Sequence, residues 1–273
     1  MNAQPIRSLA GFSVQRDGRC AMMRSLPEET AVAIVCNGGT QAVMMATPAD
    51  LEDFAIGFAL SEGFVESLDE IEAFEMAEHE AGIEARIWLT GGRAAALNER
   101  RRAMAGPVGC GLCGIESLEQ AMRPLPKLSP GGPALTHAEV EHAVEALQAH
   151  QPLHDQTRAV HAAGFLLPGK GIVAAREDVG RHNALDKLIG AMARRGLDPS
   201  AGAFVLTSRV SVDMVQKAVI ASCPILIAAS GPTVHALKLA EEAGLTLAAF
   251  ARGGGFDLYT HPQRIHPGVF DVA

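Results

Sequence analysis

The sequence has few aromatic residues and no excess of positive charge. Phe, Trp and Tyr make up 4% of the 273 residues, with a single Trp and a single Tyr. Stacking of bases on aromatic side chains, a common way of binding single-stranded nucleic acid, is therefore disfavoured. The 23 Lys and Arg are outnumbered by 31 Asp and Glu, giving a net charge of −8. Because binding of DNA or RNA depends on neutralising phosphates, we expect no nucleic-acid partner.

Cysteine and long apolar runs are also scarce. Five cysteines are too few for a disulfide scaffold, and this usage is typical of a reducing compartment, so we expect a cytoplasmic protein. The most apolar stretch, residues 218–230, is too short to cross a bilayer and contains a proline. The N-terminal residues lack the apolar core of a signal peptide. We therefore expect no membrane partner.

The chain does have enough apolar residues to fold. They make up 48% of the sequence, with 20% charged residues and a mean hydropathy of +0.14, a balance that excludes a disordered chain. The length suits one large domain or two modest ones. Residues 1–106 hold 9 Lys and Arg against 16 Asp and Glu, whereas residues 107–273 hold 14 against 15. The second part is therefore compatible with a local site for an anion.

Residues 1–104 are expected to form the smaller domain, of the α+β class. The predicted strands are 30–36, 40–46 and 83–90, the first two joined by a hairpin turn at Asn-Gly-Gly. A helix is predicted with Thr47 as its N-cap, Pro48 at its first position and Gly63 closing it. Residues 105–135 are rich in Gly and Pro and are predicted to be a linker that carries the cysteine pair.

Residues 136–273 alternate between strand and helix patterns. A capping box at Thr136 and Glu139 opens the first helix. The predicted strands are 162–167, 171–177, 203–208, 225–230 and 245–251; the later helices are 180–195, one from Ser211, and 233–243. This alternation is typical of an α/β domain with a parallel sheet and helices on both faces, a three-layer α/β/α arrangement.

Four of the predicted strands end in small, hydroxylated or cationic residues. These ends are 176–183, 208–211, 230–233 and 251–255. Ligands of open α/β sheets bind beyond the carboxyl ends of the strands, and helix N-termini with nearby Arg and Gly suit phosphate. A single polar turn is ordinary in such proteins, but four together favour a phosphorylated ligand. None of these four strand ends contains the G-x-G-x-x-G motif, and the sequence has no P-loop motif.

The pair Cys110-Gly111-Leu112-Cys113 is compatible with three chemistries. A zinc site could form with His161 as a third ligand, although four ligands are usual. A redox pair should open a helix after a strand, which is not the pattern here. An accessible thiol can also carry sulfur as a persulfide. Burial of the two cysteines as small apolar residues is disfavoured by the neighbouring glycines at 109, 111 and 114.

Two other patterns involve histidines that could take part in chemistry. Zinc deaminases need H-x-E, but His161 is followed by two alanines, so the proton-transfer carboxylate is missing. Asp178, His182 and Asp186 are spaced four residues apart and would share a face if the helix begins early. The alternatives are a structural histidine at 182 and a solvated charged face at Asp186 and Lys187.

Six motifs together resemble those of the FdhD family, the formate dehydrogenase accessory sulfurtransferases. They are VCNG followed by TPADLEDFAIGFALSEG, then CGLCG, VHAAG, REDVGRHNALDKLIG, SRVSVDMVQKA and FARGGGFDLYTHPQRI. The resemblance implies a sulfurtransferase that accepts persulfide sulfur from a cysteine desulfurase. It would transfer this sulfur to the molybdenum or tungsten bis(molybdopterin guanine dinucleotide) cofactor, which formate dehydrogenase needs. It also implies a homodimer, and a second domain resembling the cytidine deaminase fold.

The resemblance also assigns roles to residues. Cys110 would hold the persulfide, with Cys113 its neighbour in the relay, and no protein-bound metal is implied. The guanine dinucleotide end, or a GDP-like nucleotide as its mimic, would meet Phe250, Ala251, Arg252, Gly253, Gly254 and Gly255. From the strand ends we expect further cofactor contacts from His161, Asp178, Arg181, His182, Asn183, Lys187, Ser208, Arg209 and Ser211.

Two residues depart from the family pattern. Arg158 stands where a glycine is usual, and Gly255 stands where an arginine is common. Both departures bear on the affinity for the cofactor rather than on the cysteine loop. Two other functions stay open: a non-catalytic chaperone that binds the molybdenum cofactor, and a zinc-dependent, deaminase-like hydrolase.

Overall fold

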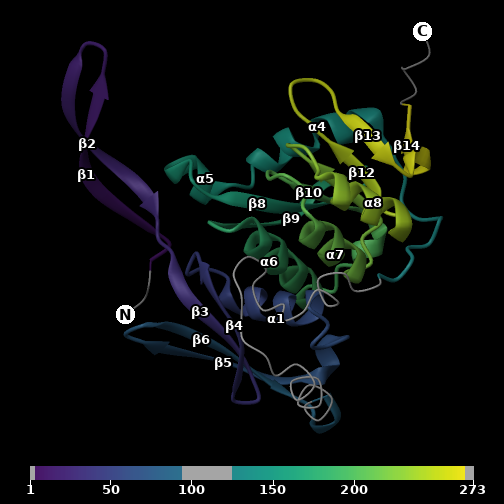
Figure 1. Cartoon of the computed structure of the whole chain (residues 1–273), viewed down its shortest axis with the longest axis horizontal. Coiled ribbons are helices and arrows are strands. Elements are labelled where there is room, and N and C mark those ends of the chain that lie inside the picture. The colour runs from purple at the N-terminus through teal and green to yellow at the C-terminus, as the bar shows by residue number, and fades with distance from the viewer. Residues whose placement is uncertain (1–3, 94–124, 268–273) are drawn as a thin grey trace.

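The computed structural model describes residues 4–93 and 125–267 (Figure 1). The first part contains a four-stranded sheet in the order β4-β3-β6-β5, with α1 packed on one face. Its elements are β3 (Thr30–Cys36), β4 (Gly39–Ala46), α1 (Leu51–Ser61), a short 3₁₀ helix (Leu68–Glu70), β5 (Ile71–His79) and β6 (Gly82–Leu89). The predicted hairpin and the strand at 83–90 are confirmed.

Buried and more exposed residues alternate along the strands, and the buried ones form the core of this first part. In β6, Ile83, Ala85 and Ile87 are buried while the residues between them are partly or fully exposed. They face Phe54 and Phe58 of α1, which are also buried. Burial of these large side chains stabilises the sheet against the helix.

The predicted start of α1 was wrong. The helix begins at Leu51, and its N-cap is Asp50, which adopts a left-handed conformation with φ 54° and makes no side-chain cap. Thr47 instead contacts the second part of the chain, donating its N–H to Asp178 and accepting from Val179 N–H at Oγ1. Thr47 is therefore a contact between the two parts and not a helix cap.

A two-stranded ribbon precedes this sheet and was not predicted. It consists of β1 (Ile6–Gln15) and β2 (Gly18–Pro27), which pair antiparallel and extend away from the rest of the molecule in Figure 1. Phe12, Val14 and Met23 are more than half exposed on it. Arg19 covers the Phe12 ring, with its guanidinium carbon 3.5 Å from the ring centre. We call this ribbon the arm.

The second part is built on a six-stranded sheet in the order β13-β12-β11-β10-β8-β9. Its strands are β8 (His161–Leu167), β9 (Gly171–Asp178), β10 (Ala203–Leu206), β11 (Ile225–Ala228), β12 (Thr246–Ala249) and β13 (Asp257–Thr260). One face packs against α4 (His137–Gln148); the other packs against α6 (Arg181–Arg194), α7 (Val212–Ile220) and α8 (Val234–Ala243). The predicted helices on both faces are present.

The sheet is mixed, so the prediction of a parallel sheet was wrong in part. Only β10, β11 and β12 run parallel, whereas β8, β9 and β13 pair antiparallel with their neighbours. The turn 168–171 joins β8 directly to β9, and so short a connection permits only an antiparallel pair. Short pieces complete this part: β7 (Leu135–Thr136), α5 (Pro152–Thr157), a 3₁₀ turn (Pro199–Ala201), another (Pro262–Arg264) and β14 (Ile265–His266).

Helix α4 begins with the predicted capping box. Thr136 Oγ1 accepts from Glu139 N–H at 3.2 Å, and Thr136 N–H donates to the Glu139 carboxylate at 2.8 Å. The residue spacing alone was sufficient for this prediction, since both partners lie within one turn. Among the described helices, none combines the length and the apolar character needed to cross a membrane.

The two parts pack together through α1 and α6, which lie backbone against backbone. A Cβ placed on Gly57 would lie 1.7 Å from the carbonyl oxygen of Asp186, and one on Gly190 would lie 1.9 Å from that of Asp53. No side chain other than hydrogen fits at either position. This contact holds the smaller sheet, α1 and α6 in successive layers (Figure 1).

Arg158 occupies a backbone conformation that favours glycine, with φ 56° at the end of α5. Its side chain is exposed, and its ion pair with Asp155, at 3.7 Å, is exposed too. We expect Arg158→Gly to raise the free energy of unfolding by about 1 kcal/mol, because a left-handed non-glycine residue is strained. Urea denaturation measures this, with Asp155→Ala as the control for the ion pair. A less stable Arg158→Gly variant would contradict the prediction.

Candidate functional site

The predicted strand ends meet at one edge of the six-stranded sheet. The carboxyl ends of β9, β10, β11 and β12 lie there, and the antiparallel direction of β8 brings its first residue, His161, opposite Asp178. Backbone hydrogen bonds join the loops in sequence: Val210 N–H to Gly231 O at 3.2 Å, and Phe250 N–H to Ser230 O at 3.5 Å. The edge is therefore one continuous surface, as ligand sites of α/β sheets are.

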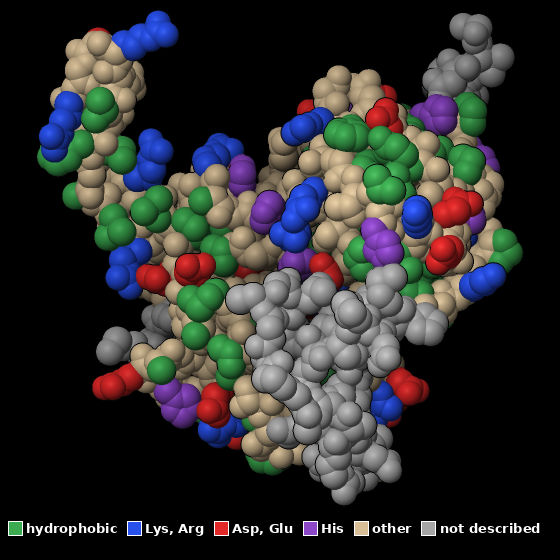
Figure 2. All heavy atoms as spheres, viewed as in Figure 1, with side chains coloured by type: hydrophobic (Ala, Val, Ile, Leu, Met, Phe, Trp, Pro, Cys, Tyr) green, Lys and Arg blue, Asp and Glu red, His purple; other side chains and the backbone are tan. Residues whose placement is uncertain are grey.

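Cationic side chains gather at this edge. The start of β8 contributes His161, the start of α6 contributes Arg181 and His182, and the loop after β10 contributes Arg209. We call these four residues the cationic cluster. Figure 2 shows Lys, Arg and His side chains beside one another over the region where Figure 1 labels α5 and β8. Burial lowers the pKa of His161, and the nearby Arg181 and His182 lower it further. Positive charge in the cluster therefore comes from Arg181 and Arg209, and an anion would balance it.

Arg181 has a buried guanidinium nitrogen without a hydrogen-bond partner among the described residues. Burial lowers the pKa of its guanidinium, and Arg209 lowers it further, while Asp213 opposes the shift. The buried nitrogen that lacks a partner among these residues is Nε. An oxygen of a phosphate or carboxylate would supply that partner, since guanidinium groups bind such anions by paired hydrogen bonds.

Asp213, in the first turn of α7, lies beside the cluster and was not predicted. Its Oδ2 is 3.3 Å from His182 Nε2, without the alignment of a good hydrogen bond. The contact with His182 lowers the pKa of the Asp213 carboxyl against the raising effect of burial. An acidic residue in the first turn of a helix is common, so no sequence signal pointed to this pairing.

The segment 250–255 forms a tight turn at the same edge. Phe250 has φ 53° and a partly exposed ring packed on Gly231, where a Cβ would lie 2.6 Å from the ring. Gly253 and Gly254 have φ of 70° and 84°, which favours glycine at both positions. Arg252 is exposed at this turn, and its N–H donates to the carbonyls of Phe250 and Gly255. The turn therefore presents a ring face and a guanidinium to solvent.

Three predicted cofactor contacts lie instead in a buried network. Lys187 Nζ is 2.6 Å from Asp178 Oδ2 and donates to Thr47 O at 2.9 Å. Asn183 Nδ2 donates to Asp178 Oδ1 and to Met45 O, both at 2.9 Å. Burial lowers the pKa of Lys187, which Asp178 opposes. Asp178, Asn183 and Lys187 thus join the two parts of the chain, and their contact with a cofactor stays a prediction.

The proposed shared face of Asp178, His182 and Asp186 is absent, and so is a solvated charged face at Asp186 and Lys187. The helix begins at Arg181, so Asp178 precedes it. The Asp178 carboxylate bonds to Gly180 N–H, while His182 faces Asp213. Asp186 is buried and contacts Lys217 at 2.9 Å and Ser61 at 2.7 Å.

Other predicted contacts differ in their accessibility. Ser208 is buried and its hydroxyl donates to Arg209 O at 3.0 Å. Ser211 lies partly exposed at the start of α7, 3.4 Å from an Asp213 oxygen. Ala251 is fully buried in the core, so only its backbone can meet a ligand. The edge thus brings together His161, Arg181, His182, Arg209, Ser211, Phe250 and Arg252 as the reachable part of the predicted site.

Cys110 and Cys113, with the linker segment 105–124, lie outside the described residues. Among the other cysteines, Cys20 is exposed on the arm, while Cys36 and Cys223 are buried. Burial raises the pKa of the Cys223 thiol to about 12, so it would not act as a nucleophile. Within residues 4–93 and 125–267 no group of three His, Cys, Asp or Glu could hold a metal.

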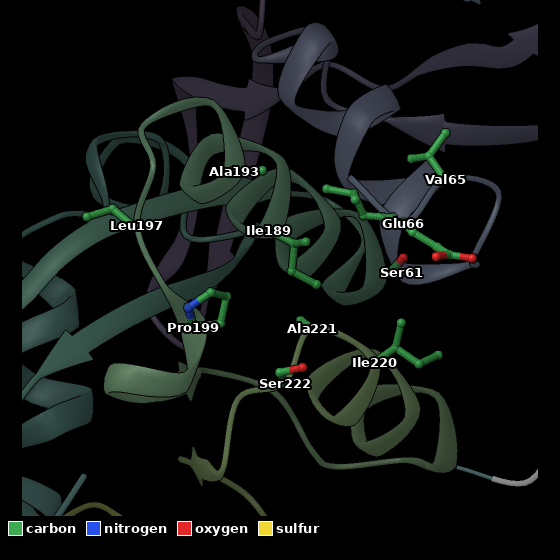
Figure 3. Close-up of a pocket in the computed structure, with 12 residues that line it drawn as sticks. Ser61, Val65, Glu66, Ile189, Ala193, Leu197, Pro199, Ile220, Ala221 and Ser222 are labelled. Atoms are coloured by element: carbon green, nitrogen blue, oxygen red, sulfur yellow. The ribbon is translucent and has the colours of Figure 1, made fainter. Parts of the chain in front are cut away.

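A cavity of about 380 Å³ lies between the two parts of the chain, away from the cationic cluster (Figure 3). Its walls come from the ends of α1, α6 and α7, including Leu60, Ile189 and Ile220. Pro199 and Ser222, which also line it, lie shortly before β10 and β11, so the cavity is at the amino ends of those strands. None of the predicted site residues lines it.

The chain was compared with known proteins. The family model described as the FdhD/NarQ family matches residues 27–266. Proteins named sulfur carrier protein FdhD from Agrobacterium fabrum and Brucella abortus are 51% and 54% identical to it over 242 residues, or 89% of this chain and 89% and 90% of their own. The protein of that name from Xanthomonas oryzae is 48% identical over 255 residues, covering 93% of this chain and 90% of its own.

A solved structure resembles the whole fold. The crystal structure described as that of a formate dehydrogenase accessory protein from Desulfotalea psychrophila superposes with a TM-score of 0.75. It is 25% identical and covers 95% of this chain and 99% of its own. The arm lies before the segment that the family model matches.

Proposed function

Because the chain belongs to the FdhD/NarQ family, we propose that it is a sulfur carrier in the maturation of formate dehydrogenase. Relatives named sulfur carrier protein are about half identical to it over nearly nine-tenths of its length, which supports that role. The finer proposal is that Cys110 takes persulfide sulfur from a cysteine desulfurase. The sulfur then passes to the bis(molybdopterin guanine dinucleotide) cofactor destined for formate dehydrogenase.

The observation that carries the cofactor part of the proposal is the cationic cluster at the sheet edge. A guanine dinucleotide has a diphosphate, and Arg181 and Arg209 offer guanidinium groups suited to its oxygens. The first turns of α6 and α7 add backbone N–H groups, because the α6 N-cap is Gly180 and the Ser211 side chain does not cap α7. The Phe250 ring and Arg252 lie at the same edge, where they could contact the base and the second phosphate.

The first chemical step is thiol–disulfide exchange. The Cys110 thiolate attacks the outer sulfur of the desulfurase persulfide, and the bond between the two donor sulfur atoms breaks. The donor cysteine leaves as a thiolate, and Cys110 carries the persulfide. The cationic cluster holds the cofactor by its nucleotide end, so that the second transfer takes place between bound partners.

The experiment that tests the proposal follows the sulfur atom. The full chain is incubated with a cysteine desulfurase and cysteine, and peptides are analysed by mass spectrometry. We expect one added sulfur on the Cys110 peptide in the unmodified chain and in Cys113→Ala, and none in Cys110→Ala. Absence of the adduct, or full maturation of formate dehydrogenase by Cys110→Ala, would overturn the proposal.

The cationic cluster equally favours a second function, that of a cofactor chaperone without sulfur chemistry. That function predicts GDP binding by a chain in which both Cys110 and Cys113 are dispensable, and the two single variants decide between them. A zinc-dependent hydrolase would instead show stoichiometric zinc in the purified full chain. Two further parts of the proposal rest on the family resemblance, a homodimer and a second domain of cytidine deaminase topology, whereas the proposed cytoplasmic location rests on the cysteine usage.

A further inference from the structure

His182 lies against a carboxylate from another helix on one side. Its Nε2 is buried, 3.3 Å from Asp213 Oδ2, yet 35% of the side chain is exposed. Nδ1, the other ring nitrogen, is not among the buried atoms without a partner. A histidine whose far nitrogen is fixed by a carboxylate presents its near nitrogen in a defined direction.

The negative charge of Asp213 is by itself unfavourable for binding an anion at this edge. A carboxylate beside the cationic cluster repels the diphosphate of a nucleotide and cancels part of the attraction of Arg181 and Arg209. Its position in the first turn of α7, with Ser211 Oγ at 3.4 Å from Oδ2, offers a purely local explanation. The two explanations predict opposite effects of removing its charge.

We propose that Asp213 is a positioning residue, which holds the His182 ring so that Nδ1 faces a phosphate bound at the sheet edge. This inference rests on the proposed function, because it assumes that the edge binds a nucleotide. The separation of 3.3 Å without good alignment is what a site awaiting its ligand shows, since such contacts often tighten on binding. By positioning His182, Asp213 would then increase the affinity for the nucleotide by more than its negative charge decreases it.

The charged groups around the pair come from several elements. Arg181 belongs to α6, Arg209 to the loop after β10, and His161 to β8, all of them cationic or able to become so. Lys217, one helical turn further along α7, also acts on Asp213. Asp178 and Asp186 are already engaged by Lys187 and Lys217.

The test measures the affinity of the full chain for GDP by calorimetry. The variants are Asp213→Asn, His182→Gln and the double variant, with Asp198→Asn as the matched control at a distant 3₁₀ turn that Asp198 caps. We expect Asp213→Asn to weaken GDP binding about tenfold, the size of effect expected if the contact with His182 becomes a hydrogen bond to a charged group when the ligand binds. We expect the double variant to bind as weakly as His182→Gln alone, because Asp213 acts through that ring.

Three results would overturn the inference. Tighter GDP binding by Asp213→Asn would show that the carboxylate only repels the nucleotide, and unchanged binding would show that it does not position His182. Multiplying effects in the double variant would show that Asp213 does not act through His182. Absence of GDP binding by the unmodified chain would remove this inference and the cofactor part of the proposed function together, whereas the first two results leave that function standing.

Discussion

Replacement of Gly57 by alanine is expected to lower the free energy of unfolding by about 3 kcal/mol or more. The added methyl carbon would lie 1.7 Å from Asp186 O and 2.7 Å from Gly190 N, both backbone atoms of α6. A backbone atom cannot turn aside as a flexible side chain can, so α1 and α6 would have to separate. Gly190→Ala should have the same effect from the other side of the contact.

Urea denaturation followed by circular dichroism measures this loss. Gly91→Ala is the matched control, because a Cβ there meets no atom within 4 Å. If Gly57→Ala were as stable as Gly91→Ala, the close approach of α1 and α6 would be wrong. The attachment of the smaller sheet to the second part would then need another explanation.

Replacement of Lys187 by methionine is expected to cost about 3–5 kcal/mol, because it leaves the buried Asp178 carboxylate without its cation. Lys187 and Asp178 are both fully buried, and 2.6 Å separates Nζ from Oδ2. The same change at Lys170, which is exposed in the turn between β8 and β9, should have little effect.

A double variant shows how much of the lost stability comes from the unpaired charge and how much from lost packing. In the double variant Asp178→Asn, Lys187→Met the uncompensated charge is gone, so part of the stability should return. Thermal unfolding of the single and double variants gives the comparison. A Lys187→Met variant as stable as Lys170→Met would show that the pair does not hold the two parts of the chain together.

Local signals allowed much of the fold to be predicted. The hairpin at 30–46 and the capping box at Thr136 depend on neighbouring residues, so the sequence pattern carries them. The gathering of the predicted strand ends at one edge of the sheet was predictable, because strands joined by α/β connections have their carboxyl ends on the same side. The arm was missed, since its apolar residues are exposed rather than packed in a core.

The buried network could not be predicted from local patterns. Thr47 and Asp178 are 131 residues apart, and Thr47 had the pattern of a helix cap. Lys187 and Asp186 have the polarity of a surface, and only packing against the first part buries them. Asp213 likewise becomes informative only when α7 is placed beside α6. The cysteine pair was identified by resemblance, and the described residues do not test it.

The arm has a practical consequence for experiments that trace sulfur. Of the three cysteines whose surroundings are described, Cys20 is the exposed one, and it lies on the ribbon that reaches furthest from the body of the molecule. A solvent-facing thiol can pick up sulfane sulfur from a donor without any enzymatic meaning. Labelling studies are therefore best carried out in a Cys20→Ser background, where an adduct cannot come from the exposed thiol of the arm.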